Sequence, residues 1–131
     1  MTNFNVKSIW WLPILAICVL SLCHDHKMVV AEDCEEELRG LNIECMYYMN
    51  KDDPSLLNPN GRCCKAITDA YPKLGCVCKN LSRKVVFPPY AGTYADLISW
   101  RRVMHCFSYC WRPLPADYKC NRFTVPNPPP K

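Results

Sequence analysis

Residues with the chemistry of catalysis are scarce in this sequence of 131 residues. It has three histidines, and only His105 lies beyond residue 31. No nucleophile elbow, phosphate-binding loop or zinc-binding helix motif is present. The carboxylates at positions 35–37 and 52–53 sit in polar clusters typical of a helix start and a loop, not in the apolar surroundings that tune a catalytic acid. We therefore expect neither enzyme activity nor a cofactor.

A strong charge of one sign and a membrane-spanning run are also missing. The chain has 16 basic and 12 acidic residues and a net charge of +4, which is too mild and too mixed to indicate a nucleic-acid partner. The apolar run from Ile9 to Leu22 is interrupted by Pro13 and Ser21 and is too short to span a bilayer comfortably. The sequence therefore indicates neither nucleic-acid binding nor a membrane anchor.

The apolar run is instead typical of a signal peptide. Lys7 precedes it, and the polar segment 24–27 follows. Val29-Val30-Ala31 is a suitable cleavage site before Glu32, so residues 1–31 are predicted to be removed on export. A cut after Cys23 is the alternative, and it would leave a His24-Asp25-His26 terminus with the ligands for copper.

Cysteines dominate the remaining 100 residues, which hold nine of the eleven. This density is typical of a disulfide scaffold. The pairs Cys63-Cys64 and Cys76-Val77-Cys78 cannot easily bridge internally, so their partners are expected elsewhere, among Cys34, Cys45, Cys106, Cys110 and Cys120. The same thiols have a spacing that suits metal ligands, but an exported chain meets an oxidising compartment in which they form bridges. We expect no metal site.

Apolar spacing and capping residues predict an all-α domain whose helices cover residues 34–48, 62–72, 74–81 and 93–109. Thr93-Tyr94-Ala95-Asp96 is a capping box that would open the last and longest helix. Prolines from Pro113 onward predict an extended tail, with residues 126–131 disordered. Asn80-Leu81-Ser82 is a possible glycosylation site and predicts an exposed helix end.

The order of the cysteines resembles the eight-cysteine framework of plant non-specific lipid-transfer proteins and of their seed-albumin and enzyme-inhibitor relatives. The segment from Cys110 to Cys120, with the following Phe-Thr-Val-Pro, resembles a lipid-transfer-like subgroup. This similarity makes Cys110 the seventh cysteine of the framework and Cys106 an extra one. For residues 32–125 the resemblance implies a compact right-handed four-helix bundle, stapled by four disulfides around an internal apolar cavity that accepts acyl chains.

The family resemblance also implies a disulfide pairing. An apolar residue between the paired cysteines, here Val77, is typical of the second type of the family. The bridges would then be Cys34–Cys76, Cys45–Cys63, Cys64–Cys110 and Cys78–Cys120. The first-type alternative exchanges the partners of Cys76 and Cys78. The ninth cysteine, Cys106, is either a buried small apolar residue in a monomer or a thiol that links two chains.

Apolar positions of the predicted helices and tail form at least the core and, if the resemblance holds, the lining of the lipid cavity. They are Leu38, Leu41, Ile67, Leu74, Leu97, Ile98, Met104, Phe107, Leu114 and Val125. Arg101 and Arg102 are candidates for contact with a lipid head group, because they lie on the helix expected at the cavity mouth. The basic pair Arg83-Lys84 is the weaker candidate, since it adjoins the possible glycan at Asn80.

The leading hypothesis is a secreted carrier in the apoplast or cell wall that binds fatty acids, lysolipids or other acyl lipids without chemistry, touching membranes transiently. The alternative is an inhibitor of proteases or α-amylase that acts through the loop at residues 51–60, or an antimicrobial defence protein on the same scaffold. Seed storage is disfavoured, because storage relatives are rich in glutamine and this chain has none.

Overall fold

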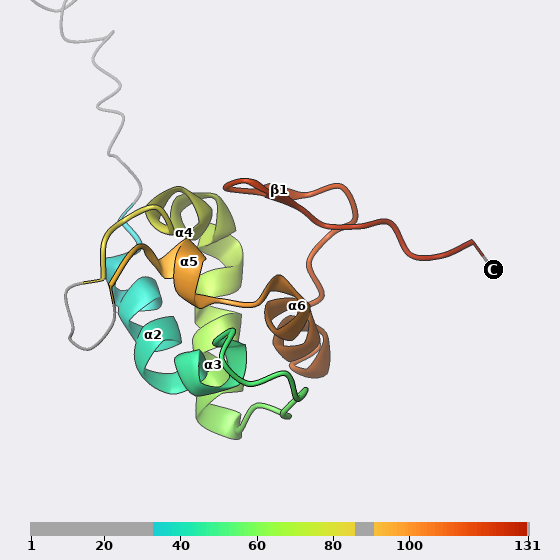
Figure 1. Ribbon diagram of the computed structural model, residues 1–131, viewed down its shortest axis with the longest axis horizontal. Helices are drawn as coiled ribbons and strands as arrows, with labels where there is room; N and C mark the ends of the chain where they lie inside the picture. The colour runs from blue at the N-terminus through green and yellow to red at the C-terminus, as the bar shows by residue number, and fades with distance from the viewer. Residues whose placement is uncertain (1–32, 86–90, 131) are drawn as a thin grey trace, which may run out of the picture. The chain divides into compact units, whose positions relative to one another are not determined.

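The structure, a computed structural model, describes residues 33–85 and 91–130. Its elements in chain order are α2 (Glu35–Met49), α3 (Gly61–Ala70), the 3-10 helix η2 (Tyr71–Lys73), α4 (Leu74–Asn80), α5 (Tyr94–Leu97), α6 (Trp100–Tyr109), β1 (Lys119–Cys120) and β2 (Phe123–Thr124) (Figure 1). The domain is mainly helical, as the sequence predicts. No helix in the described ranges is long and apolar enough to cross a membrane. The predicted signal peptide lies outside the described residues.

The first two helices begin at polar side chains that bind free backbone N–H groups. The carboxylate of Asp33 accepts a hydrogen bond from the Glu35 N–H at 3.0 Å. The side chain of Asn60 caps α3 by accepting a hydrogen bond from the Cys63 N–H at 2.9 Å. The two helices pack against one another and are joined by the Cys45–Cys63 disulfide.

The predicted helix over residues 93–109 is two helices, not one. The capping box of Thr93 and Asp96 is present, but α5 ends at Leu97 and Ile98 is extended, with ψ of 150°. The break is stabilised by backbone pairing to the end of α2, where Ser99 N–H donates to Met49 O at 2.8 Å and Lys51 N–H donates to Leu97 O at 2.9 Å. The helical prediction was wrong here because this tertiary pairing outweighs the local preference, and α2 is longer than α6.

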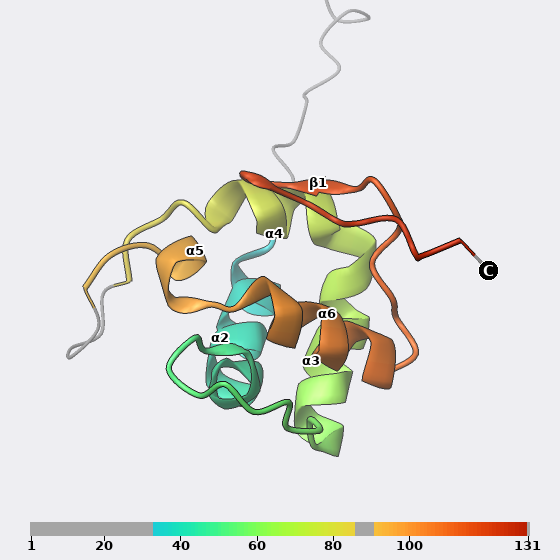
Figure 2. The same cartoon turned by 45° about the vertical axis from the view of Figure 1, so that its right-hand side comes forward.

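The C-terminal segment contains a β-hairpin where the sequence predicted only an extended tail. Strands β1 and β2 pair antiparallel, and Asn121 between them has a positive φ of 58°. The Cys78–Cys120 disulfide ties β1 to α4, and Figures 1 and 2 show the hairpin beside that helix. Phe123 of β2 stacks on Trp100 of α6, with ring centroids 4.3 Å apart. The hairpin is therefore packed against the helices at two points.

Four disulfides hold the helices together, and they have the pairing that the family resemblance implies. The bonds join Cys34–Cys76, Cys45–Cys63, Cys64–Cys110 and Cys78–Cys120. All but one of these eight side chains are buried, and they form much of the core together with Ile67, Val77, Val103 and Phe107. Because each bridge closes a loop in the unfolded chain, each is expected to add about 2–4 kcal/mol to the free energy of unfolding.

Cys106 is the free cysteine among the described residues, and its side chain is fully buried in α6. Burial raises the pKa of the thiol to about 11, because the thiolate would lose its hydration. Of the two alternatives for Cys106, its burial favours a small apolar core residue over a thiol that links two chains.

We expect the Cys106 thiol to react with iodoacetamide at pH 8 about a hundredfold more slowly than an exposed thiol. A thiol with a pKa of about 11 has about a hundredfold less thiolate at this pH than one with the ordinary pKa of 9.0. Mass spectrometry of alkylated protein, with and without guanidinium chloride, checks this expectation. Fast modification of the native protein, or a disulfide-linked dimer on a non-reducing gel, would contradict it.

Candidate functional site

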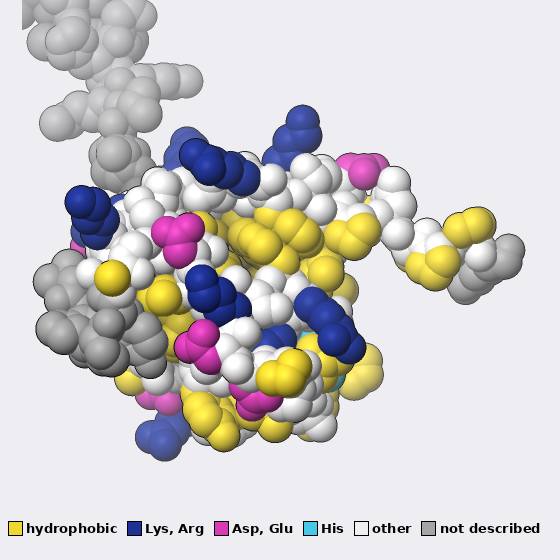
Figure 3. Space-filling model, viewed as in Figure 1, with side chains coloured by type: hydrophobic (Ala, Val, Ile, Leu, Met, Phe, Trp, Pro, Cys, Tyr) yellow, Lys and Arg dark blue, Asp and Glu magenta, His cyan; other side chains and the backbone are white. Residues whose placement is uncertain are grey.

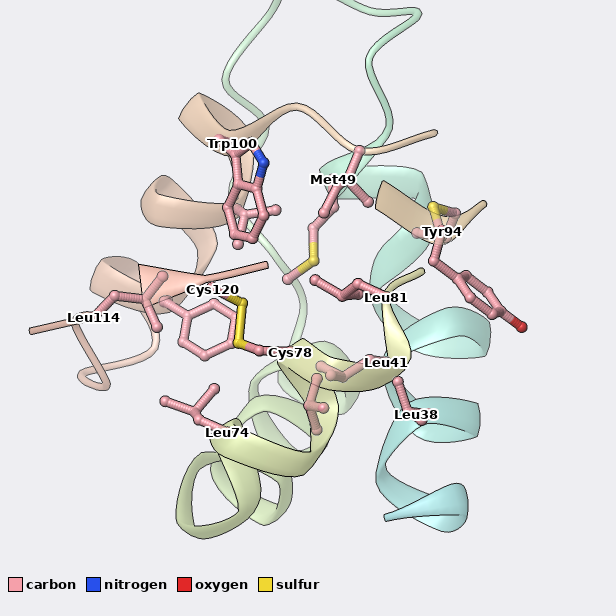
Figure 4. Close-up of a pocket in the computed structure, with 15 residues that line it drawn as sticks. Leu38, Leu41, Met49, Leu74, Cys78, Leu81, Tyr94, Trp100, Leu114 and Cys120 are labelled. Carbon is pink, nitrogen blue, oxygen red and sulfur yellow. A yellow bond between two sulfur atoms is a disulfide. The ribbon is translucent and has the colours of Figure 1, made fainter. Parts of the chain in front are cut away.

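An apolar cavity lies between α2, α4, α6 and the C-terminal segment (Figure 4). Its lining side chains are almost all hydrocarbon or sulfur, and they come from elements far apart in the sequence: Leu38, Leu41, Met46, Met49, Leu74, Val77, Cys78, Leu81, Tyr94, Ile98, Trp100, Val103, Phe107, Leu114 and Cys120. Hydrophobic side chains are also visible at the surface between the hairpin and α6 (Figure 3). The Cys78–Cys120 disulfide forms part of the wall.

Six of the ten predicted lipid-contact residues line this cavity, namely Leu38, Leu41, Leu74, Ile98, Phe107 and Leu114. Ile67 and Val125 are buried but lie outside the lining. Leu97 and Met104 are half-buried and do not line it either. Met104 lies outside the lining because the helix breaks at Ile98, and in the α6 that follows Val103 and Phe107 face the cavity.

Nine lining residues are not among the predicted lipid contacts, and only some of them could have been recognised from the sequence. Met49 continues the helical spacing of Leu38, Leu41 and Cys45, so the pattern could have included it. Trp100 likewise has the helical spacing of Met104 and Phe107, so the pattern could have included it as well. Leu81, the C-cap of α4, lies at a helix end where periodicity gives no information.

The cavity is small, with a volume of about 70 Å³. Ligand pockets usually measure about 300–1,000 Å³, so a long acyl chain requires the lining to move apart. Seven of the fifteen lining side chains are leucine or methionine, which change rotamer readily, while the disulfides hold the backbone. An apolar site of this kind selects for hydrocarbon and only loosely for its shape.

Arg102 does not have the position that a head-group contact requires. Its side chain is 2% exposed, and its guanidinium donates hydrogen bonds to Asn50 O at 2.7 Å, to Asn50 Oδ1 at 3.2 Å and to Tyr47 O at 3.4 Å. The carboxylate of Asp53 is 4.0 Å away. Arg102 thus binds the carbonyl end of α2. The neighbouring Arg101 is exposed but does not line the cavity.

The other basic pair, Arg83-Lys84, lies next to the cavity. The guanidinium of Arg83 forms a two-pronged ion pair with Glu35, with Nη2 and Oε1 3.0 Å apart. The hydrogen bonds from Arg83 hold the pKa of Glu35 below its ordinary value. Arg83 and Lys84 border a surface depression that shares Leu38 and Tyr94 with the cavity. The basic pair ranked second from the sequence is therefore the one near the site.

Asn80 of the glycosylation sequence is the last residue of α4 and is half-buried. Its side-chain amide donates a hydrogen bond to Cys76 O at 2.9 Å. The predicted exposure of this helix end applies to Ser82 and Arg83 but not to the Asn80 amide. A glycan on that nitrogen would have to displace the hydrogen bond, and its presence stays a prediction.

Other chemistry finds little support in the described ranges. Within them, no three His, Cys, Asp or Glu side chains come together in a way that could hold a metal ion. The ring nitrogen Nε2 of His105 lies 2.9 Å from Asn58 Oδ1, so this histidine joins α6 to the loop at residues 51–60. Among the residues that the structure describes, no carboxylate is hydrogen-bonded to His105.

A family model described as probable lipid transfer matches residues 15–120. No curated protein and no solved structure matches the chain. The matched segment includes all four disulfides and every residue of the cavity lining.

Proposed function

We propose, because the chain belongs to the probable lipid transfer family, that it binds acyl lipids such as fatty acids and lysolipids in the cavity between α2, α4 and α6 and carries them without chemical change. The observation that carries this proposal is the apolar lining described above. Because the lining is almost entirely apolar, a hydrocarbon chain that enters the cavity displaces little water from polar groups. The family's function is lipid transfer and not catalysis, in agreement with the lack of catalytic motifs.

The energetics support such a ligand. Each methylene removed from water contributes about 0.8 kcal/mol, so about ten of them contribute about 8 kcal/mol. Micromolar affinity corresponds to about 8 kcal/mol, and association costs must be subtracted from the burial energy. A chain of about sixteen carbons contributes about 12 kcal/mol, so at the lower association cost of about 4 kcal/mol it reaches micromolar affinity when nearly all of it is buried.

Secretion is part of the proposal. Four disulfides in one small domain are stable only in an oxidising compartment, and the predicted signal peptide would deliver the chain there. We propose that the protein acts outside the cell as a monomer, since its free thiol is buried.

The test is a titration of the oxidised protein with a fluorescent fatty acid, beside a sample with its disulfides reduced. Saturable binding that is lost on reduction is expected, because the helices that form the cavity depend on the bridges. No binding by folded, oxidised protein would overturn the proposal. In that case inhibition of proteases and α-amylase, with variants of the loop at residues 51–60, becomes the assay to run.

A further inference from the structure

The C-terminal end of α6 is a hydrogen-bonded turn that puts Trp111 in the left-handed region of backbone conformation. Trp111 N–H donates to Ser108 O at 3.1 Å, and Arg112 N–H donates to Phe107 O at 2.9 Å. This pair of bonds is the Schellman motif, in which the residue at the position of Trp111 is usually glycine. Trp111 has a φ of 59°, which residues with a Cβ atom rarely adopt. A bulky side chain thus stands where glycine would be the least strained.

The Trp111 side chain gains little packing in return. It is 84% exposed, the highest value among the exposed large hydrophobic side chains of the described residues. A buried indole would offset the backbone cost by removing its hydrocarbon from water, but this one stays in contact with solvent. Neither the conformation nor the exposure stabilises the fold. Both therefore indicate a contact that the isolated domain does not contain.

The side chains around Trp111 are aromatic and basic. Tyr109 is 48% exposed, and its ring lies 6.2 Å from the ring of His105, one turn earlier on α6. Arg112 is exposed, as is Arg101, which lies one turn before His105. Within the described ranges, neither arginine is at ion-pair distance from a carboxylate. This side of α6 thus presents two exposed aromatic rings and two unpaired positive charges.

The segment that contains Trp111 is fixed on both sides and leads to the cavity wall. Cys110, just before it, is disulfide-bonded to α3. The hydroxyl of Tyr71 donates a hydrogen bond to Pro113 O at 2.9 Å. Leu114, the next residue, lines the cavity. The exposed indole is therefore held firmly, and its main chain is only three residues away from a residue of the cavity lining.

A bilayer surface suits this patch better than a protein does. Tryptophan and tyrosine are enriched at head-group level, where the ring meets hydrocarbon and its N–H or O–H group meets water, and arginine is attracted to anionic lipids. Two aromatic side chains bury at most about 500 Å², whereas one side of a stable protein interface buries about 800 Å². A carrier that must leave the membrane after each exchange needs a weak contact of this kind.

We propose that the end of α6 docks on anionic bilayers, with Trp111 and Tyr109 as anchors and Arg101 and Arg112 as the cations. The indole enters the head-group region, and the arginines face the phosphate groups of anionic lipids. The inference rests on the proposed function and adds to it the surface on which the carrier collects or releases its lipid. Docking through Trp111 brings the part of the cavity wall formed by Leu114 near the bilayer.

The test measures co-sedimentation of the oxidised protein with vesicles of phosphatidylcholine, alone or mixed with an equal amount of phosphatidylglycerol. Wild-type protein is expected to bind the anionic vesicles about tenfold more tightly than the neutral ones. Trp111→Gly should bind the anionic vesicles at least tenfold more weakly, while its Tm equals or exceeds that of wild type, because glycine suits the left-handed position. Arg101→Gln/Arg112→Gln should lose most of the preference for anionic vesicles.

Two further variants locate the contact. Ile43→Ser removes a side chain of α2 that is 68% exposed, and it should leave vesicle binding within about twofold of wild type. In Trp100→Phe, Trp111 is the remaining tryptophan of residues 32–131. Its emission should shift to shorter wavelengths when anionic vesicles are added, because the indole leaves water.

No binding of folded wild-type protein to anionic vesicles, or unchanged binding by Trp111→Gly, overturns the docking site. A lower Tm of Trp111→Gly would show that the indole stabilises the fold and would also overturn it. An emission shift that depends on protein concentration without vesicles would assign the patch to a second copy of the chain instead. Titration with a fluorescent fatty acid in the absence of vesicles tests the cavity separately, so the docking site can fail while the proposed function stands.

Discussion

Arg102→Met is expected to lower the free energy of unfolding by about 3 kcal/mol, which corresponds to a fall in Tm of more than about 10 °C for a domain of this size. The guanidinium is buried and donates to the carbonyl oxygens of Tyr47 and Asn50 at the end of α2. These carbonyls are at the negative end of the helix dipole, where a cation is stabilising. Methionine fills the space but removes the donors that these carbonyl oxygens bind.

The matched control is Arg101→Met, one residue earlier in α6. Arg101 is exposed, so its loss should change the free energy of unfolding by less than about 0.5 kcal/mol. Arg102→Lys should be intermediate, because an ammonium keeps the charge but cannot reproduce the fork of donors. Guanidinium chloride unfolding of the oxidised proteins, followed by circular dichroism, measures all three. Equal stability of the two methionine variants would show that Arg102 does not hold α2 to α6.

Leu81→Trp is expected to weaken fatty-acid binding at least tenfold while the fold is kept. Figure 4 shows Leu81 pointing into the cavity, and its half-buried position at the end of α4 leaves the main core untouched. The larger indole would occupy the space that the hydrocarbon needs. Since that space is only about 70 Å³, a small addition to the wall removes most of it.

The control for this variant is Met104→Trp, which adds a comparable indole to α6 outside the cavity lining. Met104 was a predicted lipid contact, and the structure indicates that its replacement should leave the dissociation constant within about twofold of wild type. Titration with the same fluorescent fatty acid, after circular dichroism has established that both variants are folded, gives the comparison. If Met104→Trp loses binding and Leu81→Trp keeps it, the lipid lies elsewhere.

Most helices were predictable because they depend on local spacing, whereas the cysteine framework and its pairing were predictable only through the resemblance to the family. The helical repeat of Leu38, Leu41 and Cys45 and the cap at Asn60 are properties of short segments. The break at Ile98 was not predictable in this way, because it depends on pairing with Asn50, which is far away in the sequence. Once α6 starts at Trp100, its faces differ from those of a continuous helix, so Val103 lines the cavity and Met104 does not.

The positions of the basic residues were also beyond what local spacing can predict. Arg101 and Arg102 are adjacent, so about 100° of helix rotation separates an exposed side chain from one that is 2% exposed. Composition and spacing contain no information on which of the two is buried. The position of Arg83-Lys84 beside Leu38 and Tyr94 likewise comes from contacts between α2 and segments much later in the chain.

The most direct test of lipid binding in this cavity uses its own tryptophan. In residues 32–131 with Trp111→Phe, Trp100 is the remaining tryptophan, and it lines the cavity. Trp100→Phe instead leaves Trp111, which is 84% exposed and outside the lining. Titration with 9,10-dibromostearate, whose bromines quench indole fluorescence on contact, is expected to quench Trp100 saturably and Trp111 hardly at all, while stearate quenches neither. Binding without quenching of Trp100, or with stronger quenching of Trp111, would contradict a lipid carrier built around this cavity.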